Sequence, residues 1–288
     1  MIPAAFEYFA PGSVAEAIGL LEQHGDEAKL LAGGHSLLPA LKLRLSQPGV
    51  LIDISRVAEL HGIEAGDRLS IGAATTYAAI ASDPAVLGGC AVLAECAGQI
   101  GDIQVRNRGT LGGALAHADP AADLPAVVLA LDAAIAVQGP AGARSISADD
   151  MFVEMLTTAL EPNEVVTRVT FPVLGAGEGA SYAKLKHPAS RYAIVGVAAY
   201  VRLHADGSVA AARVAVTGAG PRAERQHATE SALVGSAGDA AAIAAAAELA
   251  GESMEYLGDI HASETYRRAM VKVYTRRALE QAVARARG

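Results

Sequence analysis

The sequence predicts an α+β protein with a two-part N-terminal domain and a C-terminal domain that contains an antiparallel sheet. Strand, helix and strand alternate within the first 55 residues, as in a small parallel βαβ unit. A run of small residues, LGAGEGAS at 174–181, then interrupts the apolar pattern. Beyond it, Asp206-Gly207 stands between two apolar runs, which predicts a β-hairpin, and two helices follow. We therefore expect a first domain over 1–175, with subdomains 1–57 and 58–175, and a second over 178–286.

The first helix has clear start and stop signals. Ser13 and Glu16 have the spacing of a capping box, and Gly25 ends the segment. The apolar residues between them fall on one helical face: Val14, Ala17, Ile18 and Leu21. KLLAGG after this helix and VLIDIS at 50–55 are expected to be short strands of one parallel sheet.

The second subdomain is expected to mix strands with short helices. Thr75 and Thr76 are candidate caps of a helix that Pro84 stops, and GCAVLAECAGQIG predicts another helix. The segment 105–123 reads as rich in loop, followed by an apolar helix or strand at 124–131. Two strands joined by a turn at Gly139–Gly142 and a strand ended by Pro172 complete the subdomain. In the second domain, helices are expected near 238–250 and at 263–286.

Composition excludes several classes of function. The chain of 288 residues has a formal net charge of −8 and a pI near 5.5, and it has no basic tract for nucleic acid. The final helix is the most basic segment, which we interpret as a solvated face or a subunit contact: Arg267, Arg268, Lys272, Arg276 and Arg277.

Cysteine usage and hydropathy predict an intracellular chain. Cys90 and Cys96 are too few to hold an iron–sulfur cluster that needs four thiolates, and we expect them to be small buried apolar residues. The N-terminus does not resemble a signal peptide, and no apolar stretch is long enough to predict a membrane span. These features favour the cytoplasm.

Two glycine pairs are the strongest functional signal. LLAGGHSLLP at 30–39 contains Gly33 and Gly34, and GTLGGALAHADPAADLPA at 109–126 contains Gly112 and Gly113 beside Thr110. Glycine lets backbone N–H groups approach and converge on an anion. One pair alone is typical of a tight turn. Two pairs, each beside a hydroxyl residue, favour a shared pyrophosphate, although simple turns stay an open alternative.

Other motifs carry less information. GAGEGA at 175–180 matches a dinucleotide fingerprint formally, but SYAKLKH after it reads as strand where the fingerprint needs a helix. Asp123 could bind a sugar hydroxyl or cap the next helix, and both interpretations stay open. His35 and His117 do not form a metal-binding set, so we assign no metal ligand and no catalytic residue.

Two long segments, AGGHSLLP and GDIQVRNRGTLGGALAHADPAADLPA, resemble the FAD-binding medium subunit of molybdenum hydroxylases, most of all its carbon monoxide dehydrogenase-like branch. FEYFAP, LIDIS and SYAKLKHPASRYAIVGVAA extend the resemblance along nearly the whole chain. The resemblance implies a two-subdomain FAD-binding domain of the vanillyl-alcohol oxidase (PCMH) type, followed by an α+β flavoprotein domain.

The resemblance also implies roles for individual residues. Asp123 would bind the sugar side of FAD, Lys184 would approach the flavin ring or ribityl chain, and Tyr192 would lie against the isoalloxazine. Leu160 is a weaker candidate for a flavin contact. The pyrophosphate would be held by two short segments: Ala32, Gly33, Gly34, His35 and Ser36, and Thr110, Leu111, Gly112, Gly113 and Ala114.

The family implies an oxidoreductase subunit that carries only FAD. A small [2Fe-2S] subunit and a large molybdopterin subunit would supply the other cofactors in a dimer of heterotrimers, with quinone, NAD or oxygen as electron acceptor. Peripheral attachment to the inner face of the membrane is left open. Carbon monoxide, aldehydes, purines and N-heterocycles are all candidate substrates of the complex. The alternatives are a self-contained flavin reductase or oxidase of the same fold, and a non-catalytic Ala-rich interaction protein.

Overall fold

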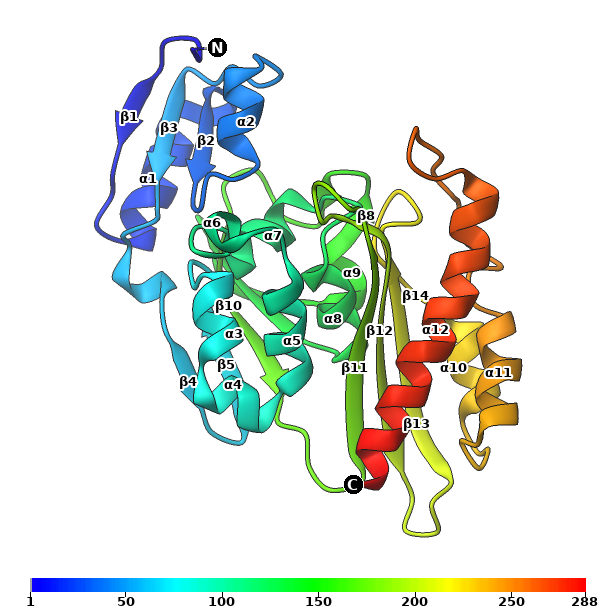
Figure 1. The fold of residues 1–288 in the computed structure, drawn as a ribbon. Helices are drawn as coiled ribbons and strands as arrows, with labels where there is room; N and C mark the ends of the chain where they lie inside the picture. Colours follow the sequence, from blue (N-terminus) through cyan, green and yellow to red (C-terminus); the bar gives the residue numbers. More distant parts are fainter. Residues whose placement is uncertain (1) are drawn as a thin grey trace.

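The computed structural model describes residues 2–288, which form three larger sheets that follow one another along the chain (Figure 1). The small N-terminal sheet stands at one end, a five-stranded sheet with its helices lies in the middle, and a four-stranded sheet carries the C-terminal helices. None of the helices in this described part of the chain is long and apolar enough to cross a membrane.

The N-terminal sheet is parallel, with strand order β1-β3-β2, as the alternation of strand and helix predicted. Ser13 caps the first helix by accepting a hydrogen bond from the amide of Glu16, and Gly25 ends that helix at a φ of 51°. The Glu16 carboxylate accepts from the amide of Gly12 at 2.7 Å. The elements are β1 (Glu7–Phe9), α1 (Val14–His24), β2 (Ala28–Leu31), α2 (Leu37–Lys42) and β3 (Val50–Asp53).

The middle sheet is antiparallel, with order β4-β5-β10-β6-β7, so the last strand of the subdomain lies at its centre. Its strands are β4 (Ile63–Ala65), β5 (Arg68–Gly72), β6 (Ala134–Gly139), β7 (Gly142–Ser147) and β10 (Val165–Pro172). Its helices are α3 (Tyr77–Ser82), α4 (Pro84–Gly89), α5 (Ala91–Gln99), α6 (Ile103–Arg106), α7 (Leu111–His117), α8 (Leu124–Ala130) and α9 (Ala148–Met151). A small hairpin of β8 (Phe152–Glu154) and β9 (Thr157–Thr158) precedes β10.

The C-terminal sheet is antiparallel, with order β11-β12-β13-β14, and Asp206-Gly207 lies in the turn between β12 and β13. Alternate residues of β12 serve two cores. Val195 and Val197 pack under the C-terminal helices, whereas Ala198 joins the core of α5 and α8. The elements are β11 (Glu178–Lys186), β12 (Ala193–Leu203), β13 (Val209–Thr217), β14 (Glu224–Arg225), α10 (His227–Leu233), α11 (Ala240–Glu248) and α12 (Glu264–Arg287).

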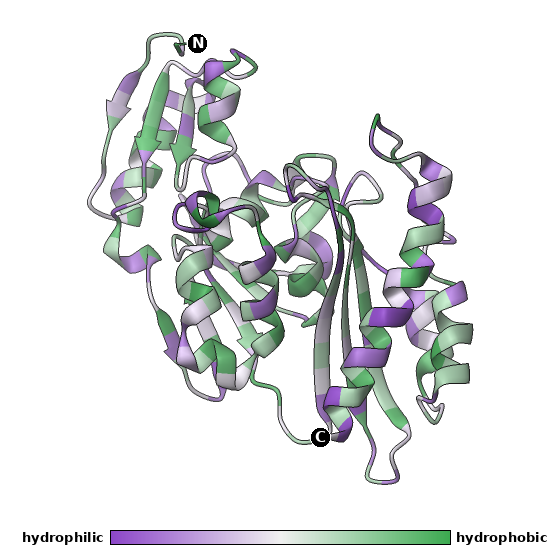
Figure 2. Ribbon diagram, viewed as in Figure 1, coloured by the Kyte–Doolittle hydropathy of each residue, from purple (hydrophilic) through white to green (hydrophobic). Residues whose placement is uncertain are grey.

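Several expectations are corrected by the structure. The segment 105–123, expected to be rich in loop, contains the end of α6 and the whole of α7, and α10 was not expected at all. Thr76 caps α3, but Thr75 is buried and donates to the carbonyl of Gly62. Figure 2 shows hydrophilic segments along α12, yet its Arg267 is not solvated: it is buried and donates to the carbonyls of Ile194 and Gly218. The expectation for the two cysteines is confirmed, since both are free and buried.

Candidate functional site

Two adjoining cavities lie where the three segments that carry the candidate residues meet. The larger has a volume of about 570 Å³ and lies between β2, α7 and β10, and the smaller, of about 210 Å³, lies between α7 and the segment before β12. Six residues line both cavities and form a shared wall: His35, Ser36, Tyr77, Gly109, Ala114 and His117. A ligand with two arms on either side of a central group fits this arrangement.

The first glycine segment, 32–36, lines the larger cavity along its whole length. The amides of Gly33, Gly34, His35 and Ser36 donate no hydrogen bond within residues 2–288. Gly34 has a φ of 77°, the left-handed conformation that glycine adopts without strain. Successive free amides around such a residue form a concave anion site. These N–H groups face the cavity without a partner among the described residues, so they can donate to an anionic group placed there.

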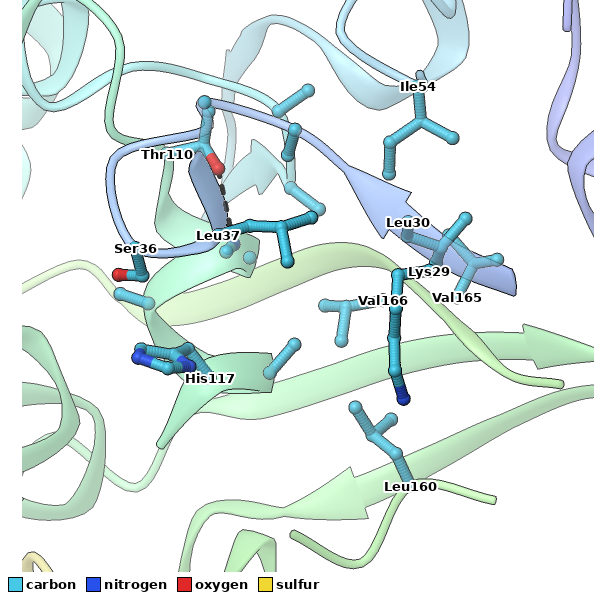
Figure 3. A pocket seen from close by; sticks show the side chains of 18 of the residues that line it. Lys29, Leu30, Ser36, Leu37, Ile54, Thr110, His117, Leu160, Val165 and Val166 are labelled. Atoms are coloured by element: carbon cyan, nitrogen blue, oxygen red, sulfur yellow. Dashed lines mark hydrogen bonds between the residues drawn. The ribbon is translucent and has the colours of Figure 1, made fainter. Parts of the chain in front are cut away.

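The second glycine segment is the N-terminus of a helix and not a loop or a simple turn. Thr110 caps α7 by accepting from the amide of Gly113 at 3.2 Å (Figure 3). The amide of Leu111 donates to the carbonyl of Thr75, and the amide of Gly112 donates to that of Ala73. These amides are therefore committed within the fold. The expectation that both glycine segments donate amides to one anion is wrong for the second segment.

Close backbone packing, and not the donation of amides to a ligand, explains why glycine is needed at Gly33 and Gly112. A Cβ added to Gly33 would lie 2.0 Å from the backbone oxygen of Arg108, so 32–36 and 108–110 pack backbone against backbone. A Cβ on Gly112 would lie 2.5 Å from the Cβ of Ala73. Leu111 is buried in the core and lines neither cavity, whereas Thr110, Gly112, Gly113 and Ala114 form part of the larger cavity's wall.

Asp123 lines the smaller cavity, but it does not cap α8. It stands at the N-cap position and makes no side-chain capping bond. Its carboxylate accepts instead from Lys184 Nζ at 2.8 Å and from the hydroxyl of Tyr182. Burial raises the pKa of Asp123, while the Lys184 ammonium and the Tyr182 hydroxyl lower it in part. The carboxylate is thus held rigidly, with one side toward the cavity.

Lys184 lies behind Asp123. Its side chain is fully buried in the ion pair, and it lines neither cavity. Its ammonium compensates the charge of the Asp123 carboxylate and holds it in place. The flavin contact expected of Lys184 stays a prediction. A solvated tip, the ordinary alternative for a strand lysine, is absent.

Tyr192 and Leu160 line different cavities. Tyr192 is 47% exposed and lines the smaller one, beside Ser190 and Arg191. Leu160 lines the larger one together with Lys29, Leu30, Val165 and Val166, away from Ser36 and His117 (Figure 3). The two side chains therefore lie at different cavities, and the flavin contacts expected of Tyr192 and Leu160 stay predictions.

Several cavity residues were not singled out from the sequence as part of the site, among them three polar or aromatic ones. Lys29 and Tyr77 line the walls, and His117 faces both cavities although it was considered only as a metal ligand. His117 follows Ala114 by three positions, a spacing that places both residues on one face of α7. That spacing was readable only if 111–117 had been recognised as a helix.

Comparisons with known proteins agree with this geometry. A family model described as the FAD binding domain in molybdopterin dehydrogenase matches residues 4–174, and the CO dehydrogenase flavoprotein C-terminal domain matches 180–282. The carbon monoxide dehydrogenase medium chain of Hydrogenophaga pseudoflava is 44% identical over 99% of both chains. The 6-hydroxypseudooxynicotine dehydrogenase complex subunit alpha of Paenarthrobacter nicotinovorans is 38% identical, covering 100% of this chain and 97% of its own.

A solved structure of carbon monoxide dehydrogenase from Hydrogenophaga pseudoflava superimposes with a TM-score of 0.96, at 45% identity and 99% coverage of both chains. The similarity therefore extends over both domains and is not confined to the glycine segments.

Proposed function

Because this chain belongs to the FAD-binding medium subunits of molybdenum hydroxylases, we propose that it is the FAD-carrying, electron-transfer subunit of a carbon monoxide dehydrogenase-like complex. The observation that carries the proposal is the row of uncommitted amides at Gly33–Ser36, which lines the larger cavity and reaches the smaller one at His35 and Ser36. FAD has the matching form, with a pyrophosphate between a flavin arm and an adenosine arm.

The residues present fit FAD as follows. Amides of 33–36 and the Ser36 hydroxyl hold the pyrophosphate, and Thr110, Gly113 and Ala114 form the facing wall. Asp123 accepts hydrogen bonds from sugar-side hydroxyls, and Tyr192 contacts the flavin in the smaller cavity. Apolar side chains of the larger cavity, Leu160 among them, accept the adenosine arm. We assign residues 1–175 to FAD binding and 178–286 to the C-terminal domain that supplies Tyr192 and Lys184.

When bound, FAD supplies redox chemistry in one- and two-electron steps, and the chain contributes binding, orientation and electrostatics. The other redox centres belong to partners. Cys90 and Cys96 are buried and free, so this chain does not provide the thiolates of an iron–sulfur cluster. A small subunit would hold [2Fe-2S] clusters and a large subunit would hold molybdopterin, in a dimer of heterotrimers, and this chain would hold the flavin that exchanges electrons with them. Quinone, NAD or oxygen accepts the electrons, and the two free thiols fit a reducing compartment such as the cytoplasm.

The test is direct. The purified full chain, alone or with the subunits that co-purify with it, is expected to be yellow and to release FAD rather than FMN on denaturation. The chain alone is expected to show no carbon monoxide or hydroxylase turnover. A colourless chain under both preparations would favour an interaction protein, and substrate turnover by the single chain would favour a self-contained flavoenzyme.

A further inference from the structure

Two histidines stand at the wall that the cavities share. His117, the last residue of α7, and His35, within the free-amide segment, line both cavities. Both side chains are exposed to this space. His117 makes no hydrogen bond within the part of the chain described here, and His35 makes one weak contact, from Nδ1 to the carbonyl of Gly33 at 3.3 Å. Their rings are therefore available to a ligand at the wall.

The other charged groups of the smaller cavity are already engaged. Asp123 is paired with Lys184, and Asp119 accepts from the amide of Ala121 at 2.8 Å. Arg191 donates to the carbonyl of Gly101. Tyr77 and Tyr192 face the same space, and burial raises the pKa of each phenol, so both stay neutral.

The larger cavity adds no cation at the shared wall. Lys29 lies at its far end, near Leu160 and Val166 (Figure 3). Glu164 is held by Arg144, and the amide of Glu161 donates to the Glu164 carboxylate at 2.8 Å. Uncharged amides supply only dipoles to a pyrophosphate that carries two negative charges. Arg191 lines only the smaller cavity, so the basic side chains at the shared wall itself are the two imidazoles.

We propose that His117, assisted by His35, binds the FAD pyrophosphate as a protonated imidazole, so that FAD binding takes up a proton. This inference rests on the proposed function and adds a ligand that the sequence analysis did not assign. Histidine changes charge between about pH 5 and 8, and a neighbouring anion favours its charged form. FAD itself does not change charge in this interval. The bound protein therefore holds more protons than the free protein, and FAD affinity falls as the pH rises through the interval.

The experiment measures FAD affinity of the full chain, or of the complex in which it is purified, after removal of the bound flavin. Flavin fluorescence is titrated at about pH 6 and about pH 8, and calorimetry in two buffers of different ionisation enthalpy counts the protons taken up. Affinity of the natural chain is expected to fall about tenfold between these pH values. His117→Gln is expected to weaken binding about tenfold at the lower pH and by less than about threefold at the higher pH, because a charged hydrogen bond is lost only where it existed.

Controls separate the pyrophosphate from other causes. His204→Gln, an exposed residue in the β12–β13 turn, is expected to leave the pH profile unchanged. ADP-ribose, which has the pyrophosphate but no flavin, is expected to compete with the same pH dependence. When His35→Gln is added to His117→Gln, FAD affinity is expected to depend still less on pH.

Affinity that does not change with pH, or His117→Gln with the natural pH profile, would overturn the inference while leaving the proposed function intact. Failure of the natural chain and its complex to bind FAD at either pH would overturn the proposed function as well.

Discussion

Replacement of Lys184 by methionine tests the buried ion pair behind the smaller cavity. The Lys184 side chain is 0% exposed and that of Asp123 is 5% exposed, so the carboxylate has no access to bulk water as a substitute partner. Methionine fills most of the volume but leaves Asp123 with the Tyr182 hydroxyl as its remaining hydrogen-bond donor. Removing one partner of such a pair costs about 3–5 kcal/mol, because an uncompensated charge stays buried.

The assay is urea unfolding of the FAD-free chain at neutral pH, since bound FAD would add its own stabilisation. Lys184→Met is expected to lower the free energy of unfolding by about 3 kcal/mol. Asp123→Asn together with Lys184→Met is expected to cost less than Lys184→Met alone, because the buried charge is gone. The stability lost in Lys184→Met should also become smaller in acid. Burial already raises the pKa of Asp123, and without the ammonium the folded variant keeps a proton on this carboxyl at pH values where the unfolded chain has lost it. Lowering the pH therefore favours the folded variant.

Two results would refute this reasoning. The first is a loss below about 1 kcal/mol, the value of an exposed pair. The second is a double variant whose loss equals the sum of the two single losses, which means that the residues are not coupled. The same variants test the indirect role of Lys184: in the Asp123→Asn background, Lys184→Met is expected to cause no further loss of FAD affinity.

Two further predictions concern the glycine segments. Gly33→Ala places a Cβ 2.0 Å from the backbone oxygen of Arg108, so we expect the free energy of unfolding in urea to fall by about 3 kcal/mol and bound FAD to be lost. The control is Gly19→Ala, on an exposed face of α1, where an added Cβ would have no atom within 4 Å. This substitution should stabilise the chain by about 0.5–1 kcal/mol. Equal effects of the two substitutions would contradict the packing argument. Thr110→Val removes the cap of α7 and is expected to cost about 1 kcal/mol and to weaken FAD binding, whereas Ser263→Ala, which uncaps α12, should cost a similar amount with FAD affinity unchanged. Unchanged FAD affinity in Thr110→Val would separate α7 from the cofactor site.

Local signals predicted most of the elements because each depends on neighbours in sequence. Ser13 reaches an amide three residues away, Gly25 takes a conformation that glycine adopts freely, and the Asp206-Gly207 turn joins adjacent strands. The helix α7 was missed because two glycines in its first turn lower helix propensity. Its stability comes instead from tertiary contacts, in which the amides of Leu111 and Gly112 donate to the segment after β5.

The candidate site shows the same division. The sequence by itself determined the family, because each of its motifs is a short run of neighbouring residues that can be read without the fold. Only the tertiary structure decided which amides stay free, that Asp123 pairs with a lysine 61 residues away, and that His117 faces both cavities. Hydrogen-bond partners between distant segments are chosen when the segments pack, so no local pattern records whether a given N–H group is committed or left for a ligand.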